Sequence, residues 1–206
     1  FQVIDDNGNS TANITGTTYT VAHLKTINNA TSGAIVLATP TADLSGTVAN
    51  IKAAFAGTVT TNTGAVTISD ANTTDITATD ITTIDTAISG AITVTNTIDI
   101  NGSGSEVAAA FTAIDTNTGN ATANVTGTDY TVAHLKTIND KGSGAIVLAA
   151  PTANLTGDVA DVVAAFAGTV TTNTGTITIS DAAEVNITAT DITTINTAIT
   201  GAITVS

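Results

Sequence analysis

The amino-acid sequence predicts an α/β solenoid, built from stacked coils that each hold short β-strands and one short capped helix. A long internal repeat and a regular alternation of strand-like and helix-like segments predict this fold class. The composition agrees with it, because about a quarter of the chain is Thr, which favours strands together with Val and Ile. Apolar residues make up 42% of the chain and aromatic residues only 3%, so the expected core is aliphatic.

The internal repeat relates two long stretches of the chain. The segment that begins at Thr11 reads TANITGTTYTVAHLKTIN, and the segment that begins at Thr122 reads TANVTGTDYTVAHLKTIN. The difference between the two starting positions, 122 − 11 = 111, is the period of this super-repeat. The correspondence holds without a gap from residues 11–94 to residues 122–205, and about three quarters of the paired positions are identical. We expect one continuous solenoid array over residues 1–206. The super-repeat copies are 11–121 and 122–206, of which the second is incomplete, and residues 1–10 are expected to be the end of a preceding unit.

Each complete copy is expected to hold four units of 25–33 residues, with one short helix per unit. Apolar residues at helical spacing, preceded by a capping residue, mark these helices. In the first copy the expected N-caps are Thr20, Thr47, Asp80 and Ser105. The expected helices span Thr20–Asn28, Thr47–Ala56, Asp80–Ser89 and Ser105–Ile114, with the apolar stripes Val21/Leu24/Ile27, Val48/Ile51/Phe55, Ile81/Ile84/Ile88 and Val107/Phe111/Ile114.

Strand-like runs fill the rest of each unit. One run follows the Gly-rich turn after a helix, as at Gly33–Leu37 and Gly90–Val94, and a second short run precedes the next helix, as at Leu44–Gly46. A single unit buries too few aliphatic side chains to offset the entropy lost on ordering its backbone. Stacking on neighbouring units must therefore supply the remaining stabilisation.

Charge and composition exclude several classes of partner. The net charge is −13, with four Lys and no Arg, which argues against binding to nucleic acid or to an anionic membrane surface. No apolar run is long enough to cross a bilayer, so we expect no membrane insertion. The chain contains no Cys, and its small, acidic composition favours an extracellular or cell-surface location.

The two ends of the sequence suggest self-association. Phe1–Asp5 matches Phe111–Asp115, and the last residues, Val205-Ser206, match Val94-Thr95. The stretch between Val94 and Phe111 has no second copy. We expect that copies join end to end or that the chain is part of a longer array.

Two sets of residues could carry chemistry. The first set is an acidic series with a residue at every fifth position: Asp70, Asp75, Asp80 and Asp85. Their carboxylates could offer oxygen ligands to Ca²⁺, the one cofactor we consider. The alternative is that these residues cap helices and stabilise turns. The chain has two His residues, His23 and His134, at one equivalent position of the two copies, and no catalytic constellation surrounds either. We assign no catalytic and no cofactor-binding residues and expect no enzyme activity; a polysaccharide lyase or hydrolase would need clustered carboxylates or basic residues in a groove.

Repeated phrases such as Leu44–Val48, Ala54–Val59 and Ile76–Ile81 resemble tandem repeats of very large extracellular and cell-surface proteins of marine cyanobacteria and other aquatic bacteria. The resemblance covers essentially the whole chain and implies a structural array that takes part in motility or adhesion. The expected function is a building block of a surface filament, fibre or surface layer, whose role is stacking and self-association. The alternatives are an adhesin stalk or an ice- or carbohydrate-binding solenoid; Thr-x-Thr pairs such as Thr15/Thr17 and Thr77/Thr79 suggest the ice-binding alternative.

Overall fold

The computed structural model describes residues 9–182 and 185–206. In these ranges the protein is mixed α/β, with seven helices and four small parallel sheets. The chain forms two compact units whose segments alternate along the sequence: Phe1–Ala71, Asp80–Asn96 and Ala113–Thr118 belong to the first, and Asn72–Thr79, Thr97–Thr112 and Gly119–Ser206 to the second. Most of the segment 1–10, expected to end a preceding unit, lies outside the described residues.

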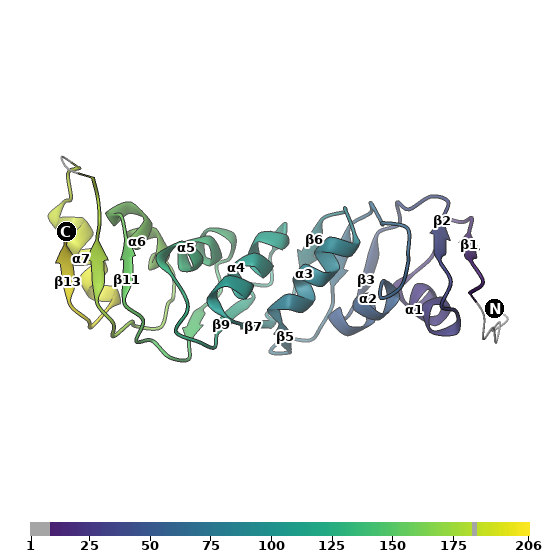
Figure 1. The fold of residues 1–206 in the computed structure, drawn as a ribbon, viewed down its shortest axis with the longest axis horizontal. Coiled ribbons are helices and arrows are strands. Elements are labelled where there is room, and N and C mark those ends of the chain that lie inside the picture. Colours follow the sequence, from purple (N-terminus) through teal and green to yellow (C-terminus); the bar gives the residue numbers. More distant parts are fainter. Residues whose placement is uncertain (1–8, 183–184) are drawn as a thin grey trace. The chain divides into compact units, whose positions relative to one another are not determined.

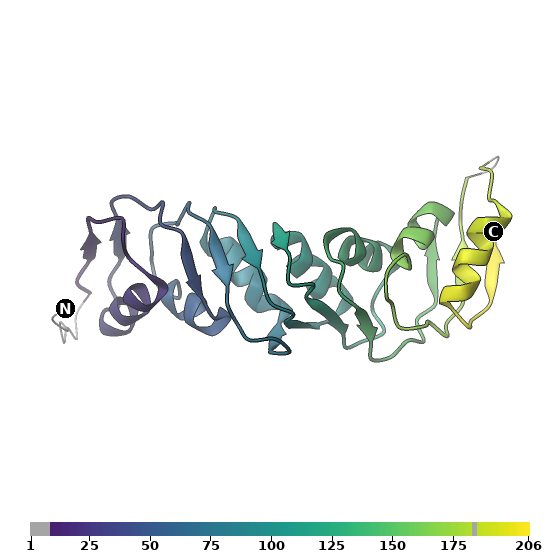
Figure 2. The same ribbon diagram turned by 180° about the vertical axis from the view of Figure 1, so that it is seen from behind.

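The first unit contains two parallel sheets and three helices (Figure 1). In the larger sheet each strand is hydrogen-bonded to the next in the order β3-β4-β6-β8, and β4 and β6 lie in front of helix α3 in Figure 2. Helices α1 and α2 pack against each other. The elements are β1 (Ala12–Ile14) and β2 (Ile35–Leu37) in the small sheet, β3 (Leu44–Gly46), β4 (Val66–Ile68), β6 (Ile92–Val94) and β8 (Thr116–Asn117) in the larger one, and helices α1 (Val21–Ala30), α2 (Val48–Ala54) and α3 (Ala78–Ala87).

The second unit also contains two parallel sheets, with the strand orders β10-β9-β7-β5 and β11-β12-β13. Helix α6 packs against both α5 and α7. Its elements are β5 (Asp75–Thr77), β7 (Asp99–Gly102), α4 (Gly104–Ala113), β9 (Thr122–Val125), α5 (Val132–Lys141), β10 (Ile146–Leu148), β11 (Leu155–Gly157), α6 (Val159–Ala165), β12 (Ile177–Ile179), α7 (Ala189–Ala198) and β13 (Ile203–Val205).

The prediction of a solenoid is wrong. A solenoid needs the equivalent strands of all its units to pair in continuous sheets along the array. The strands belong instead to four separate sheets of two to four strands, and the chain divides into two compact units. The sequence contains a physical reason for this difference: the units of the repeat differ in length, and strands only two to four residues long cannot compensate for such shifts in register.

The super-repeat is nevertheless visible in the elements. Helix α5 starts and ends at the counterparts of the first and last residues of helix α1, and the same holds for β13 and β6. The apolar stripes expected on the helices of the first copy form the core, except that Ile27 of α1 is half-buried. The exposed fraction is 0% for Leu24 and Ile51 and 1% for Phe111. Helical spacing in the sequence therefore located the buried face of each helix correctly.

The expected N-caps are half right. The hydroxyl groups of Thr20 and Thr47 accept the N–H groups of His23 and Asn50, at 3.2 Å and 3.3 Å, and cap α1 and α2 as predicted. Asp80 is not an N-cap, because α3 begins at Ala78 and places Asp80 in its first turn.

Ser105 is also not an N-cap, because α4 begins one residue earlier, at Gly104. The hydroxyl of Ser103 accepts the N–H of Glu106 at 3.3 Å, and the Glu106 carboxylate accepts the N–H of Ser103 at 2.8 Å. This reciprocal pair is a capping box. Helix α7 has the same arrangement between Thr188 and Asp191. The spacing of Ser or Thr three residues before Glu or Asp is the sequence signal that identifies both caps.

A buried tyrosine–asparagine pair recurs in both units. In the first unit, Tyr19 donates its hydroxyl to Asn62 Oδ1 at 2.8 Å, and Asn62 Nδ2 donates to the carbonyl groups of Ala42 and Gly64, both at 3.0 Å. Asn62 is 0% exposed. Burial raises the pKa of the Tyr19 hydroxyl, which therefore stays protonated as a donor. The amide of Asn62 thus provides hydrogen bonds to two loop carbonyl groups, those of Ala42 and Gly64, which lie outside the strands and helices.

Candidate functional site: a repeated strand edge and its surroundings

The four aspartates considered for calcium have separate surroundings. Asp70 is buried, with 7% exposed, and its carboxylate accepts the N–H of Val48, the first residue of α2, at 2.7 Å. Asp75 accepts from the side-chain amide of Asn101 at 3.1 Å. Asp80 forms an ion pair with Lys52, and Asp85 is exposed on α3.

Among residues 9–182 and 185–206, no three or more His, Asp and Glu side chains are grouped so that they could hold a metal ion. Calcium binding at the aspartate series stays a prediction. It would compete with the internal partners of Asp70 and Asp80, the Val48 N–H and the Lys52 ammonium. The role of Asp70 recurs in the second copy, where Asp181 accepts the N–H of Val159 at 2.8 Å. In both copies, therefore, an aspartate from a later segment of the chain accepts the N–H of the first residue of a helix and stabilises the start of that helix.

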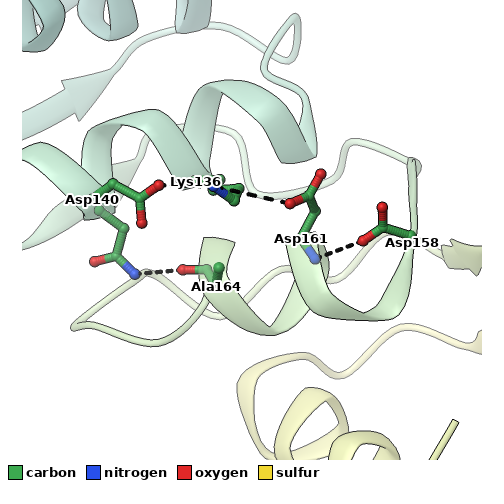
Figure 3. Close-up of polar contacts among 6 residues, drawn as sticks. Lys136, Asp140, Asp158, Asp161 and Ala164 are labelled. Carbon is green, nitrogen blue, oxygen red and sulfur yellow. Dashed lines mark hydrogen bonds and ion pairs between the residues drawn. The ribbon is translucent and has the colours of Figure 1, made fainter.

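Polar side chains join neighbouring helices in both copies. Figure 3 shows Lys136 of α5 between Asp140 of the same helix, at 2.9 Å, and Asp161 of α6, at 3.9 Å. The hydrogen bond from Lys136 to Asp140, with the charge of that carboxylate, raises the pKa of Lys136. In the first copy the equivalent lysine, Lys25, donates to Asn50 of α2 at 2.7 Å.

An asparagine makes a second contact between the same helices. Asn139 of α5 donates its side-chain amide to the carbonyl of Ala164 in α6 at 2.8 Å, and Asn28 of α1 donates to Ala53 of α2 at the same distance. Both accepting residues, Ala53 and Ala164, are small and leave their carbonyl groups accessible to this side chain. These polar groups are engaged in holding the helices together, and their arrangement assigns them a structural role.

Each histidine lies in the first turn of its helix, α1 or α5. The backbone N–H of His23 and of His134 donates to the capping threonine of its own helix, Thr20 or Thr131. His134 is half-buried, and a side chain on Gly104 would come within 3.1 Å of His134 Nδ1. This position therefore packs closely against the start of α4.

A row of hydroxyl side chains crosses the larger sheet of the first unit. One residue of each strand takes part in the row: Ser45 lies opposite Thr67, Thr67 opposite Thr93, and Thr93 opposite Thr116. All four are exposed or half-buried, whereas the flanking residues of β4 and β6 are buried. The second copy repeats the row with Thr156, Thr178 and Thr204. The Thr-x-Thr pairs singled out in the sequence are different residues, so the pattern along the chain did not identify this row.

The strand edge beside β6 is covered in the first unit. The N–H of Asp115 donates to the carbonyl of Ile92 at 3.0 Å, and the Asp115 carboxylate accepts the N–H of Ile92 at 2.9 Å. Further along, the N–H of Thr118 donates to the carbonyl of Val94 at 3.0 Å. Strand β8 thus pairs with the outer edge of β6, and both Ile92 and Val94 are 0% exposed.

The equivalent strand of the second copy, β13, is the last strand of its sheet. Val205 occupies the position of Val94 and is 63% exposed, and Ile203, in the position of Ile92, is half-buried.

Comparison of the chain with protein-family models, with curated protein sequences and with solved structures finds no match. Within the described residues, none of the helices has both the length and the apolar character that a membrane-crossing helix requires. The function is therefore inferred from the geometry described above.

Lowering the pH is expected to weaken two helix starts. Hydrogen bonds from the Ser103 backbone and hydroxyl lower the pKa of Glu106, and those from the Thr188 hydroxyl and backbone lower the pKa of Asp191. A carboxylate whose pKa is lower in the folded state stabilises the fold when the pH is above its pKa in the unfolded state. This contribution is lost as the pH falls through its pKa in the folded state. The melting temperature should therefore decrease as the pH falls below about 4.5.

The control for this pH dependence is a double variant, Glu106→Gln with Asp191→Asn, which keeps oxygen acceptors at both caps but removes their titration. Thermal unfolding followed by circular dichroism should show a smaller loss of melting temperature between about pH 5 and pH 3 in the variant than in the unmodified chain. An identical loss in both proteins would show that these caps do not contribute to the pH dependence.

Proposed function

We propose that the chain is a non-enzymatic structural repeat protein, a building block of an extracellular filament, fibre or surface layer, and that its role is to associate with further copies of itself. The observation that carries this proposal is the repetition of the same elements in the two copies. Helix α5 and strand β13 begin and end at the counterparts of helix α1 and strand β6. Units of a repeat protein are stabilised by contacts with neighbouring units of the same kind.

Other features support this proposal. Lys136 and the aspartates around it, the buried Tyr19–Asn62 pair and the carboxylate of Asp70 all have internal partners that hold elements together. The net charge of −13 argues against nucleic acid as the partner. The acidic, Cys-free composition and the resemblance to bacterial surface repeats support a location outside the cell.

Electron microscopy of the purified chain tests the proposal. At high protein concentration and in salt sufficient to screen the negative charge, we expect elongated assemblies with a regular axial repeat. Particles of single-chain size at every concentration and salt condition would contradict a role based on self-association. A chain that binds a soluble ligand while it stays monomeric would point to a binding function instead.

A second candidate function is binding of an ice or carbohydrate surface, and the hydroxyl row of Ser45, Thr67, Thr93 and Thr116 favours it. Paired strands hold these side chains at a spacing of about 4.8 Å, which gives a regular array of hydroxyl and methyl groups. Thermal hysteresis that is lost in the isosteric variant Thr67→Val would support ice binding. The absence of hysteresis in the unmodified chain would exclude it. An adhesin stalk is the remaining alternative and predicts binding to a carbohydrate or cell surface without self-assembly.

A further inference from the structure

The larger sheet of the first unit carries a second row of hydroxyl groups beside the first. Side chains of a strand alternate between its two faces, so the residue two positions after each member of the first row lies on the same face. The backbone pairing continues to these positions. The N–H of Ser69 donates to the carbonyl of Gly46, and the N–H of Thr118 donates to that of Val94, both at 3.0 Å. The second row consists of Ser69, Thr95 and Thr118, which are all exposed.

The two rows together form a surface that we call the hydroxyl face, and its hydroxyl groups are available to an external partner. Among residues 9–182 and 185–206, the side chains of Thr67, Thr93 and Thr95 form no hydrogen bond with another group of the protein. Threonine hydroxyls elsewhere in the chain are used internally. Thr63, for example, donates to a backbone carbonyl at 2.9 Å and Thr97 to another at 2.7 Å. The hydroxyl face therefore differs from the rest of this Thr-rich chain in its unused hydroxyl groups.

The core beneath the sheet fixes the geometry of the hydroxyl face. The neighbours of Thr67 and Thr93 in their strands are all 0% exposed: Val66, Ile68, Ile92 and Val94. Thr is branched at Cβ, so its hydroxyl and methyl groups have few alternative positions. Strand pairing places neighbours in a row ~4.8 Å apart, and the rise along a strand places the two rows about 6.6 Å apart. The result is a fixed two-dimensional grid of hydroxyl and methyl groups.

Charge and aromatic content restrict what this grid can bind. All of its side chains are Ser or Thr and carry no charge, although the whole chain has a net charge of −13. Planar sugar surfaces are bound mainly through stacking on the flat faces of aromatic rings. The aromatic residues of the described part of the chain are all buried: Tyr19, Tyr130, Phe55, Phe111 and Phe166. Within that part no ring is exposed for stacking on a sugar, so the grid favours a neutral lattice of small groups.

We propose that the hydroxyl face binds the surface of ice, with a lattice of ordered water as its ligand. Methyl groups order the water around them, and hydroxyl groups without a partner in the protein hydrogen-bond to that water. The spacing of ~4.8 Å between strands is close to a repeat distance of oxygen atoms in ice, so water held on neighbouring strands can join one lattice. This inference rests on the second candidate function: it selects ice as the ligand and extends the site from one row to two. It is independent of the proposed self-association.

Lysine variants in each row test this proposal. Thr93→Lys and Thr95→Lys place a long, charged side chain in the first and the second row. Thr86→Lys is the matched control, because it makes the same change of charge at an exposed position of α3, behind β4 and β6 in Figure 2. We expect thermal hysteresis in the unmodified chain, its loss in both row variants and its retention in Thr86→Lys. Circular dichroism of the three variants should match that of the unmodified chain, and the exposed Thr95 provides the test should Thr93→Lys alter the fold.

Four results would overturn the inference. Absence of hysteresis in the unmodified chain would exclude ice binding and leave the proposed self-association, which is measured separately, as it stands. Hysteresis that survives in Thr95→Lys but not in Thr93→Lys would restrict the site to one row. Loss of hysteresis in Thr86→Lys as well would show an effect of charge rather than of the hydroxyl face. Binding to insoluble cellulose or chitin that is lost in Thr93→Lys, without hysteresis in the unmodified chain, would assign the face to carbohydrate.

Discussion

Replacing Gly90 with alanine is expected to lower the free energy of unfolding by about 3 kcal/mol. Gly90 lies in the turn before β6, directly beside the turn that contains Gly64. A Cβ atom on Gly90 would lie 1.9 Å from the Gly64 carbonyl oxygen and 2.5 Å from its carbonyl carbon. These are backbone atoms and cannot move aside as the end of a flexible side chain could, so the turns would have to separate.

The matched control is Gly16→Ala. A Cβ atom at Gly16 meets nothing within 4 Å, and neither glycine has a positive φ, so the two substitutions differ only in the space available. Urea unfolding of both variants should show a large decrease in stability for Gly90→Ala and a change within about 0.5 kcal/mol for Gly16→Ala. Similar stabilities for the two variants would mean that the turns are not in close contact in solution.

Asn173→Ala is expected to destabilise the protein by about 3 kcal/mol or more. Asn173 is 0% exposed and accepts the hydroxyl of Tyr130 at 2.7 Å. Its amide group donates to the carbonyls of Ala153 and Gly175, at 3.0 Å and 3.3 Å. Alanine leaves both carbonyls and the tyrosine hydroxyl without this partner inside the protein, and each buried polar group without a partner costs about 1–3 kcal/mol.

The control for this substitution is Asn196→Ala, at an exposed position of α7. Its stability in urea should stay within about 0.5 kcal/mol of the unmodified chain. The variant Tyr130→Phe should lie between the two, because it removes the hydroxyl and leaves the amide contacts of Asn173 in place. A small effect of Asn173→Ala would indicate that water replaces the amide and that the site is less buried than the structure shows.

The parts of the fold that depend on local spacing could be predicted from the sequence. The helical stripes, such as Val48, Ile51 and Phe55, are buried as expected, and Thr20 and Thr47 cap their helices. These features depend on residues three or four positions apart, and the repeat shows each of them twice. The caps at Ser103 and Thr188 were not predicted, although each lies three residues before an acidic residue, the spacing of a capping box.

The arrangement of the strands could not be predicted in the same way. Strands of two to four residues have little periodicity of their own, and their partners are distant in the sequence, as Leu44 is from Val66. The repeat of the sequence suggested a uniform solenoid, but the pairing of each strand depends on the length of the segment between it and its neighbour. The same limitation applies to the hydroxyl row of Thr67 and Thr93 and to the pair of Tyr19 and Asn62, which are 43 residues apart.

Sedimentation equilibrium of the full chain tests the central claim, that copies of the chain associate with one another, most directly. Salt screens the repulsion between molecules that each carry a net charge of −13. We predict that the average mass rises above that of one chain, 20.2 kDa, as the protein and salt concentrations increase. A mass of one chain at every protein and salt concentration would contradict a role based on self-association.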